Sequence, residues 1–144
     1  MTVAVILKHK GAAVETVRST ATVQQMCDLL SSKKIGAAVV VGAANEVIGL
    51  VSERDLVHAV SMHGAAGLNR TIDEVMTRNV ATCCLTDSSQ DLMEMMTRGR
   101  FRHVPVVEGG RLVGIVSIGD IVKRRIEDSD LERHAMRDYI AHAG

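Results

Sequence analysis

The sequence predicts an α/β (α+β) fold built from two β-α-β-β-α repeats that pack about a pseudo-two-fold axis. The first observation behind this prediction is that the chain aligns with itself, with one residue fewer in a turn of the second half. The second observation is that both halves show the same order of apolar patterns. Matching pairs include Thr16/Thr82, Gln24/Gln90, Gly49/Gly114, Ser52/Ser117 and Asp55/Asp120.

The first repeat is expected to contain three strands and two helices. Val23, Met26 and Leu30 recur at the spacing of one helix face and indicate an amphipathic helix. A hairpin follows it, in which Gly42 and Asn45 suit the positive φ that tight turns demand. The expected elements are a strand at 14–17, a helix at 23–30, strands at 37–41 and 47–51, and a helix at 55–62.

The second repeat is expected to copy this order after a Gly/Ala-rich linker and a short helical turn. The charged C-terminal part alternates in sign and indicates a solvated or partner-facing helix, with a break near Ser129. We therefore predict a first domain at 1–66 with an N-terminal segment, and a second at 67–144 with a C-terminal helical extension. The expected elements are a linker at 63–69, a turn at 71–76, a strand at 80–84, a helix through 92–96, strands at 104–107 and 112–116, and a helix from Asp120 onward.

Length and composition narrow the classes of protein. The chain has 144 residues, of which 47% are hydrophobic, so it can bury a core. A repeat of about 50 residues has too little core to stand alone, so the two should pack together and form two equivalent clefts at their seam. The 17 basic and 17 acidic residues cancel, which argues against nucleic-acid binding. Phe101 and Tyr139 are the only aromatic residues, which argues against a base-stacking platform.

Short motifs in both halves resemble a known family. The second half reads VPVV at 104–107 and VGIVSIGD at 113–120, and the first half reads VVV at 39–41 and IGLVSERD at 48–55. Their order, spacing and duplication closely resemble the CBS domain family in its stand-alone bacterial form, in which a tandem pair is called a Bateman module. The resemblance covers roughly 14–127. It implies a regulatory module that binds adenine-containing ligands such as AMP, ADP, ATP, NAD(H) or S-adenosylmethionine, commonly as a homodimer.

The Ser-x-x-Asp motif carries the ribose contact that the resemblance implies. In the family the aspartate accepts hydrogen bonds from both ribose hydroxyls, which assigns Asp55 and Asp120 to ribose, while Ser52 and Ser117 lie near phosphate. The helix N-terminus that follows also favours phosphate. The same pattern is typical of a capping box, which stabilises a helix by about 1 kcal/mol without any ligand. Both interpretations stay open at this point.

Basic residues predict a phosphate clamp in one cleft. In related modules a basic pair before the Val-Pro-Val strand reaches the phosphate of a ligand held by the other repeat, which pairs Arg102 and His103 with Asp55. The resemblance also places Thr77 near the ligand, and Arg54 can reach a phosphate from the start of its helix. The alternative interpretation is that the basic residues form a solvated edge and that Thr77 is an ordinary capping residue. In the first repeat, the positions that match this basic pair are Gly36 and Ala37, which are small and uncharged. The two clefts are therefore expected to differ.

The adenine ring is expected between aliphatic side chains, because the chain offers almost no aromatic ones. This agrees with the family, which holds the base between branched residues and reads its edge with backbone groups at the first strands. The alternative for each threonine is an ordinary strand residue. The base-binding candidates are Thr16, Val39, Ile48, Thr82, Val104, Pro105 and Val113.

Other signals predict neither catalysis nor metal binding. The histidines are dispersed, and Cys27, Cys83 and Cys84 form neither a disulfide framework nor a CxxC site, so we expect no metal. No nucleophile with an oriented base is visible, so we expect no enzyme and no catalytic cofactor. The apolar run at 3–7 is too short for a signal peptide and nothing resembles a membrane span, so a cytoplasmic location is expected.

Two functions compete. The first is a sensor that binds an adenine nucleotide and signals in trans to an unknown regulated protein, through its conformation or its homodimer contacts. The alternative is a dimerisation or interaction module whose pockets are vestigial. Ligand-induced stabilisation separates the two, because only a working cleft raises the melting temperature.

Overall fold

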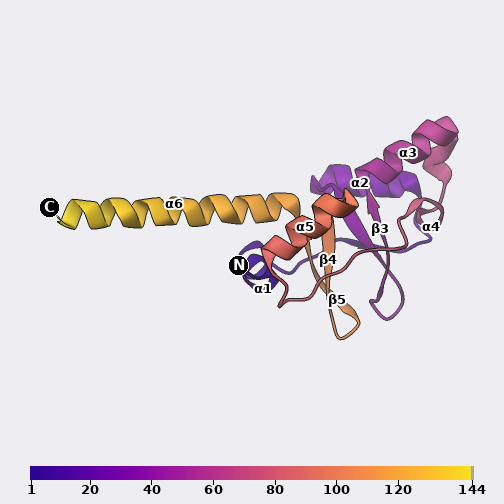
Figure 1. The fold of residues 1–144 in the computed structure, drawn as a ribbon. Helices are drawn as coiled ribbons and strands as arrows, with labels where there is room; N and C mark the ends of the chain where they lie inside the picture. The colour runs from indigo at the N-terminus through magenta and orange to yellow at the C-terminus, as the bar shows by residue number, and fades with distance from the viewer. Residues whose placement is uncertain (144) are drawn as a thin grey trace.

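The structure is a computed structural model that describes residues 1–143, and it has the predicted two-repeat α/β fold (Figure 1). The helices are α1 (Val3–Lys10), α2 (Val23–Lys33), α3 (Glu53–His63), the 3-10 helix η1 (Gly64–Asn69), α4 (Ile72–Val75), α5 (Ser89–Gly99) and α6 (Ile118–Ala143). The strands are β1 (Thr16–Val17), β2 (Ala37–Val41), β3 (Val47–Ser52), β4 (His103–Glu108) and β5 (Arg111–Ser117).

The first half consists of the sheet β1-β2-β3 covered by helices. β1 runs parallel to β2, and β2 pairs with β3 antiparallel, with Val39 opposite Leu50. α2 begins at a capping box in which Thr22 Oγ1 accepts from Gln25 N at 3.1 Å and Thr22 N donates to Gln25 Oε1 at 2.9 Å. The helix buries Met26 completely against the sheet, as its apolar spacing predicts.

The second half repeats the hairpin but not the preceding strand. β4 and β5 pair antiparallel from His103/Ser117 to Glu108/Arg111. The prediction of a strand at 80–84 is wrong, because within this segment only Cys83 forms a β-bridge, which is parallel and pairs it with Val106. The chain turns immediately after it: Cys84 N donates to the carboxylate of Asp87 at 2.8 Å, and Asp87 N donates to Cys84 O at 3.1 Å. This turn ends the pairing after one residue.

Helix α1 opens the chain but packs into the second half. Its Val3, Ile6 and Leu7 are at most 7% exposed, and they join the core built by α5, β4, β5 and α6. Figure 1 shows the helix beside this half, away from α2 and α3. The apolar run at 3–7 is too short for a signal peptide, and its pattern alone does not predict this helix. The first ten residues therefore complete the core of the repeat that follows them at a distance.

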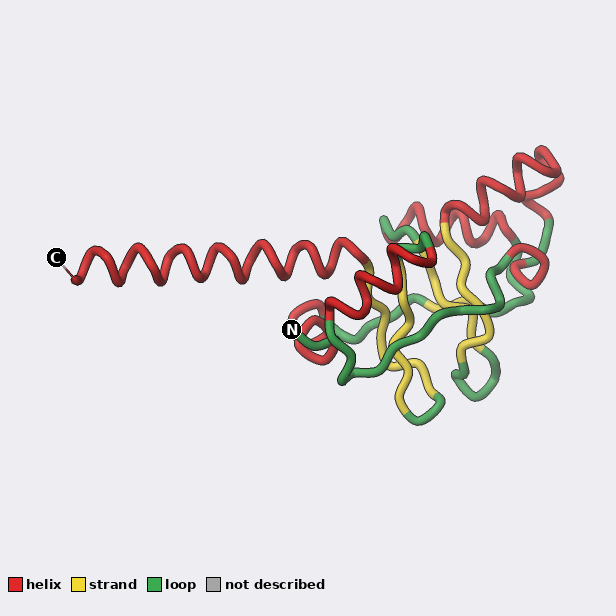
Figure 2. The backbone as a smooth tube through the Cα atoms, viewed as in Figure 1, coloured by secondary structure: helices red, strands yellow, loops and turns green. Residues whose placement is uncertain are grey.

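The two halves meet at a small apolar seam between their hairpins. Val39, Val41 and Leu112 are buried there. Asn45 sits at the tip of the first hairpin with φ of 62°, and its O accepts from Leu112 N at 3.3 Å. The seam packs the two repeats against each other and brings the ends of both hairpins together. Figure 2 shows the strands of both halves side by side.

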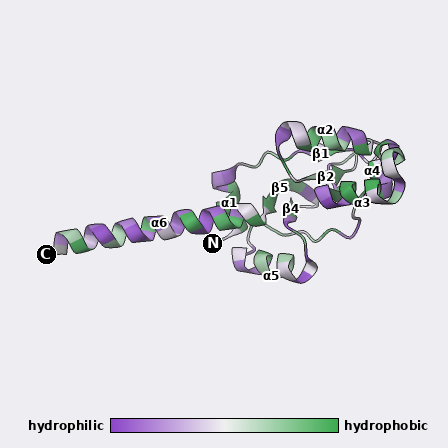
Figure 3. Ribbon diagram, turned by 90° about the horizontal axis from the view of Figure 1, so that it is seen from above, coloured by the Kyte–Doolittle hydropathy of each residue, from purple (hydrophilic) through white to green (hydrophobic). Residues whose placement is uncertain are grey.

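Helix α6 runs for 26 residues without the break expected near Ser129. No glycine or proline lies between Asp120 and Ala143, so nothing interrupts its hydrogen-bond ladder. Arg124 also supports it through an ion pair to Asp128 at 3.0 Å. The helix projects from the body, and its surface mixes hydrophilic and hydrophobic positions (Figure 3). Within residues 1–143 no helix is long and apolar enough to cross a membrane.

Candidate functional site

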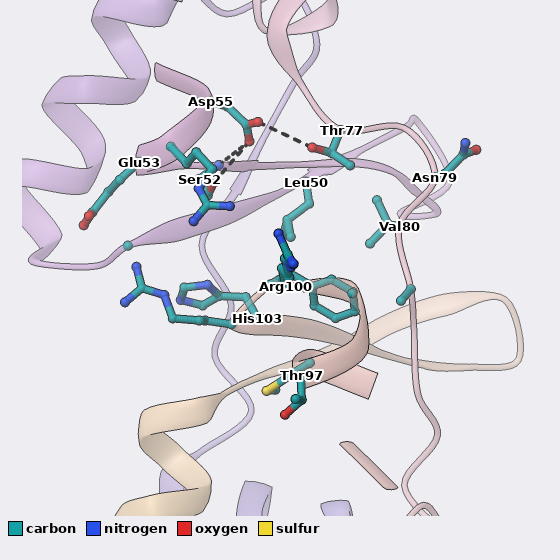
Figure 4. A pocket seen from close by; sticks show the side chains of 17 residues that line it. Leu50, Ser52, Glu53, Asp55, Thr77, Asn79, Val80, Thr97, Arg100 and His103 are labelled. Atoms are coloured by element: carbon teal, nitrogen blue, oxygen red, sulfur yellow. Dashed lines mark hydrogen bonds between the residues drawn. The ribbon is translucent and has the colours of Figure 1, made fainter. Parts of the chain in front are cut away.

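A cavity of about 530 Å³ lies between the two halves (Figure 4). Three segments line it: the end of β3 with the first turn of α3, the loop from Thr77 to Ala81, and the stretch from the end of α5 to His103. The first segment comes from one repeat and the third from the other. The cavity is large enough for a small organic ligand, and such pockets favour the interfaces between folding units.

Asp55 occupies one side of the cavity. Its Oδ2 accepts from Ser52 N at 2.8 Å and lies 3.2 Å from Ser52 Oγ, so the carboxylate caps the start of α3. Its Oδ1 is 3.4 Å from Thr77 Oγ1, a long contact. Capping thus engages one oxygen strongly and leaves the other for a further donor. The capping interpretation and the binding interpretation are compatible in this geometry.

Thr77 reaches Asp55 because the chain straightens after α4. Met76 has extended backbone, with φ of −66° and ψ of 155°. Thr77 N donates to Leu50 O at 2.9 Å, and Leu50 N donates to Thr77 O at 2.9 Å. These two bonds fasten the loop to β3 and aim the hydroxyl at the carboxylate.

Basic side chains form the opposite side of the cavity. Figure 4 shows Arg100 and His103 across from Asp55 and Thr77. Arg102 lines the cavity from the same stretch, and Arg54 lines it from the first turn of α3, so Arg54, Arg102 and His103 line the same cavity as Asp55. The arrangement places the Asp55 carboxylate opposite a group of basic side chains, and Glu53 from the first turn of α3 lines the same cavity.

His103 is neutral by preference at this position. Burial lowers the pKa of His103 most, and the charges of Arg102 and Lys10 lower it further. Asp120 and Glu53 act in the other direction without reversing the shift. A neutral imidazole still offers one N–H donor to a phosphate oxygen, and an anion bound beside it favours its protonation.

The small residue at Gly36 leaves room for the histidine. A Cβ built at this glycine would lie 3.4 Å from Glu53 Oε1 and 3.5 Å from His103 Cε1. A longer side chain there would enter the space of the imidazole. An alanine at position 36 would fit at ordinary contact distance, whereas a side chain as long as that of Arg102 would meet the imidazole.

Arg100 is a cavity residue that the sequence analysis did not select. It follows α5 in the left-handed region, with φ of 57° and ψ of 42°, and its N–H bonds Met96 O. Lys34 ends α2 in the same conformation, with φ of 54°. In the sequence, only the position of Arg100 two residues before Arg102 indicates that it could lie near the ligand. The left-handed cap that turns it toward the cavity depends on the tertiary fold.

The predicted base-binding residues do not line the cavity. Val39 and Val104 are 0% exposed in the seam and in the second core, and Pro105 is buried. Ile48 and Val113 are partly buried, while Thr16 and Thr82 are exposed away from the cavity wall. The apolar wall consists instead of Leu50, Val80, Ala81, Met96 and Phe101.

Asp120, the counterpart of Asp55, lies outside this cavity. Its Oδ2 accepts from Ser117 N at 2.8 Å, and Asp120 N donates to Ser117 Oγ at 3.1 Å, so the pair forms a reciprocal cap. Lys10 Nζ reaches the same Oδ2 at 2.6 Å. Burial alone would raise the pKa of Asp120, but hydrogen bonds from Lys10 and Ser117 outweigh it and hold the pKa below its ordinary value.

Among residues 1–143, no three His, Cys, Asp or Glu side chains are placed to hold a metal ion. Burial raises the pKa of the Cys83 thiol to about 12, with Asp87 and Cys84 adding to it, so Cys83 stays protonated. A protonated, buried thiol is a poor nucleophile and a poor metal ligand.

Two repeats with this fold, a Ser-x-x-Asp at each helix start and a cavity at their seam define a paired ligand-binding module. Residues 11–62 and 72–127 match the CBS domain family. The chain belongs to the CBS domain family and carries two copies of the domain. A CBS pair is a module known to bind adenosine-containing ligands, and the family typically consists of non-catalytic regulatory modules.

Solved structures and curated relatives agree with this assignment. The CBS-domain containing protein ATU1752 of Agrobacterium tumefaciens is 47% identical, with a TM-score of 0.84 over 87% of this chain and 99% of that one. The CBS domain pair of protein MJ0100, solved in complex with 5′-methylthioadenosine and S-adenosyl-L-methionine, is 25% identical, with a TM-score of 0.79 over 89% of this chain and 98% of that one. Protein MJ1225 of Methanocaldococcus jannaschii is 33% identical over 110 residues, which are 76% of this chain and 39% of that protein.

Proposed function

We propose that this chain binds an adenine nucleotide, AMP, ADP, ATP or NAD(H), in the Asp55 cavity and uses it as a regulatory signal. The observation that carries the proposal is the pairing of Asp55 with a basic cluster across one cavity. A carboxylate suits the cis-diol of a ribose, and arginines suit phosphate. The phosphate group would lie against Arg54, Arg100, Arg102 and His103.

The basic cluster also favours a phosphorylated ligand over an uncharged nucleoside. MJ0100 was solved with 5′-methylthioadenosine and S-adenosyl-L-methionine, which carry no phosphate. Arg54, Arg100 and Arg102 line the cavity together with the carboxylates of Glu53 and Asp55, which leaves an excess of positive charge that an anion can neutralise. A nucleotide supplies that anion, and its base would lie against Leu50, Val80 and Ala81.

Asp55 would bind the ribose without giving up its structural role. Its Oδ2 stays with Ser52 N, at 2.8 Å, while its Oδ1 exchanges the 3.4 Å contact with Thr77 for the two hydroxyls. The proposed ligand contact therefore needs no change in the start of α3. We propose no role for the cavity in bond making or breaking.

The output is proposed to act in trans through a homodimer. Helix α6 supports this part of the proposal, because it leaves the body with large apolar side chains exposed. Ile126 is 57% exposed, Met136 60% and Ile140 64%. Exposed apolar faces of this kind mark interaction sites. The same helix also supports the alternative, an interaction module that never uses its cavity, so a binding measurement must separate the two.

Thermal unfolding and titration calorimetry with AMP, ADP, ATP, NAD⁺, NADH and S-adenosylmethionine test the nucleotide function. At 100 times its Kd, a ligand of the folded state stabilises the chain by about 2.7 kcal/mol. Asp55→Ala is expected to abolish binding. Arg100→Ala is expected to weaken nucleotide binding about tenfold while affecting adenosine less, because a charge-assisted hydrogen bond contributes about 1.5–3 kcal/mol. Arg98→Ala, on the same helix, is the matched control and should bind normally.

The loss of a helix cap must be separated from the loss of binding. Ser88→Ala removes the hydroxyl that accepts from Asp91 N at 3.1 Å, far from the ribose position, and it should cost about 1 kcal/mol of stability without affecting affinity. The regulatory proposal is wrong if no ligand of the panel shifts the wild-type melting temperature. The vestigial-pocket alternative then stands.

A further inference from the structure

The two Ser-x-x-Asp carboxylates are presented in the same way. Ser52 N donates to Asp55 Oδ2 at 2.8 Å, and Ser117 N donates to Asp120 Oδ2 at 2.8 Å. Each carboxylate follows the second strand of its hairpin and starts the helix behind it. Any difference between the two clefts must therefore come from what surrounds these carboxylates.

Helix α1 takes the place in the second half that α4 takes in the first. Ile72 N donates to Ala21 O at 2.8 Å, and Val3 N donates to Asp87 O at 2.9 Å, at the matching point of the other repeat. The next residues repeat the correspondence, with Asp73 N to Ser19 O at 2.9 Å and Ala4 N to Leu85 O at 3.0 Å. The start of the chain is thus a structural copy of the segment before Thr77.

The same correspondence holds where these helices meet the sheets. Met76 Sδ lies 2.5 Å from a Cβ built on Gly49, and Leu7 Cδ1 lies 2.7 Å from one built on Gly114. These are matching glycines, and each is needed because a large apolar side chain presses on the strand. Leu7 therefore corresponds to Met76, and the two copies differ only in what comes next.

At Met76 the backbone is extended, whereas after Leu7 the chain continues as helix α1. Thr77 N donates to Leu50 O, and its hydroxyl lies 3.4 Å from Asp55 Oδ1. In the second copy α1 continues to Lys10, whose ammonium donates to Ile115 O at 2.7 Å and to Asp120 Oδ2 at 2.6 Å. Ile115 is the counterpart of Leu50. The ammonium of Lys10 therefore bonds the same two residues of the repeat as Thr77 does, but it bonds Oδ2 of Asp120, whereas Thr77 bonds Oδ1 of Asp55, and it adds a positive charge.

This lysine changes what the second carboxylate can bind. Asp120 is neutralised by a short ion pair, and the side chains of Lys10 and Asp120 are only 29% and 21% exposed. A ribose diol would have to share the Asp120 carboxylate with a charged, partly buried donor on Oδ2, whereas at Asp55 it displaces one long hydroxyl contact on Oδ1. Directly before Asp120 the chain also has Gly119, whereas Arg54 precedes Asp55.

We propose that Lys10 is a built-in occupant of the second cleft: it holds Asp120 in the place of a ribose, so that each chain takes a single nucleotide, at Asp55. The inference rests on the nucleotide-binding function proposed above and names its stoichiometry. The N-terminal helix thereby makes a symmetric fold functionally one-sided. Removing the ammonium would expose a latent site that recognises a nucleoside by its diol, without a phosphate clamp.

Equilibrium dialysis and calorimetry with adenosine and AMP test this inference on the full chain. Wild type is expected to bind one equivalent of either, and Lys10→Met a second equivalent of adenosine. In the Asp55→Ala background, adding Lys10→Met is expected to restore one adenosine site with affinity raised about tenfold or more over Asp55→Ala alone. Lys8→Met, an exposed lysine on the same helix, is the matched control and should leave the stoichiometry at one.

Each outcome decides a separate point. Two equivalents in wild type, or no second site in Lys10→Met, overturn the role of Lys10 while the proposed function survives. No binding by wild type overturns the proposed function, and an adenosine site gained by Lys10→Met would then still support the occupant. If Lys10→Met does not fold, as judged by circular dichroism, Lys10→Gln replaces it, and the wild-type stoichiometry remains decisive by itself.

Discussion

Asp55 divides its two carboxylate oxygens between stability and proposed binding. One oxygen caps α3 through Ser52 N at 2.8 Å, and the other faces the cavity with only the 3.4 Å contact to Thr77. Asp120 keeps the same cap, but Lys10 takes part in its charge balance at 2.6 Å. The same residue type in the same motif thus has different neighbours in the two halves.

His103 is the residue whose protonation should affect folding most directly. It faces Arg102, Lys10, Asp120 and Glu53 at the seam, and burial first, then the two cations, lower its pKa from 6.5. The unfolded chain therefore takes up this proton at a higher pH than the folded chain does. Stability is fully retained above about pH 6.5 and falls as the pH drops toward the folded pKa of His103.

Urea unfolding at pH 7.5 and pH 5.5 checks this expectation. Wild type should lose more stability between the two pH values than His103→Gln, because the variant cannot take up the proton. His58→Gln, an exposed histidine on α3, should behave as wild type. Equal losses in wild type and His103→Gln would show that His103 does not govern this dependence.

Helix α1 is the element that distinguishes the two halves. It supplies three buried side chains to the second core and presents Lys10 to Asp120. α4 supplies Ile72 to the first core but ends at Val75, which lets Thr77 pair with β3. The different lengths of α1 and α4 therefore determine that Asp120 is contacted by the ammonium of Lys10 and Asp55 by the hydroxyl of Thr77.

Leu7→Ala is expected to destabilise the chain by about 2–4 kcal/mol, because it empties the space over Gly114 in a core that cannot fully relax. The side chain is 7% exposed and lies within contact of that strand. Chemical unfolding monitored by circular dichroism measures the change. Val5→Ala, on the exposed side of the same helix, should change stability by less than about 1 kcal/mol. Similar effects from both variants would contradict the assignment of α1 to the second core.

At the scale of the whole molecule, the candidate ligand site lies at the seam, and the candidate contact surface lies on α6. The seam brings a carboxylate from one half toward arginines from the other, and α6 carries apolar side chains away from the body (Figure 1). Val122, Ile126, Met136 and Ile140 recur on one face of this helix, while Leu131 lies on the opposite face. We expect that face to be covered in a homodimer.

Sedimentation velocity tests the role of α6. Wild type is expected to sediment as a dimer, and the double substitution Met136→Asp with Ile140→Asp as a monomer, because two charges at an apolar interface are costly. Leu131→Asp, equally exposed on the other face, should remain dimeric. A monomeric wild type, or a dimer that survives the double substitution, would exclude this face as the contact.

Much of the fold could be predicted from local patterns. The capping residues Thr22 and Gln25 begin α2, the glycine and asparagine turns close the hairpins, and the duplicated Ser-x-x-Asp begins α3 and α6. The predicted strand at 80–84 and the predicted break near Ser129 failed for local reasons. A turn closed by Asp87 ends the strand pairing after Cys83. The segment around Ser129 stays helical because it contains neither glycine nor proline.

The sequence by itself determined the duplication and the family, because these follow from motifs read along the chain, whereas the pairing of Asp55 with Arg102 and His103 is what the family resemblance implies. Only the tertiary structure decided that Arg100 faces the cavity, that Val39 and Val104 are buried, and that Lys10 holds Asp120. The last contact joins residues 110 positions apart. Such contacts depend on how helices and hairpins pack in space, and a local pattern carries no information about that packing.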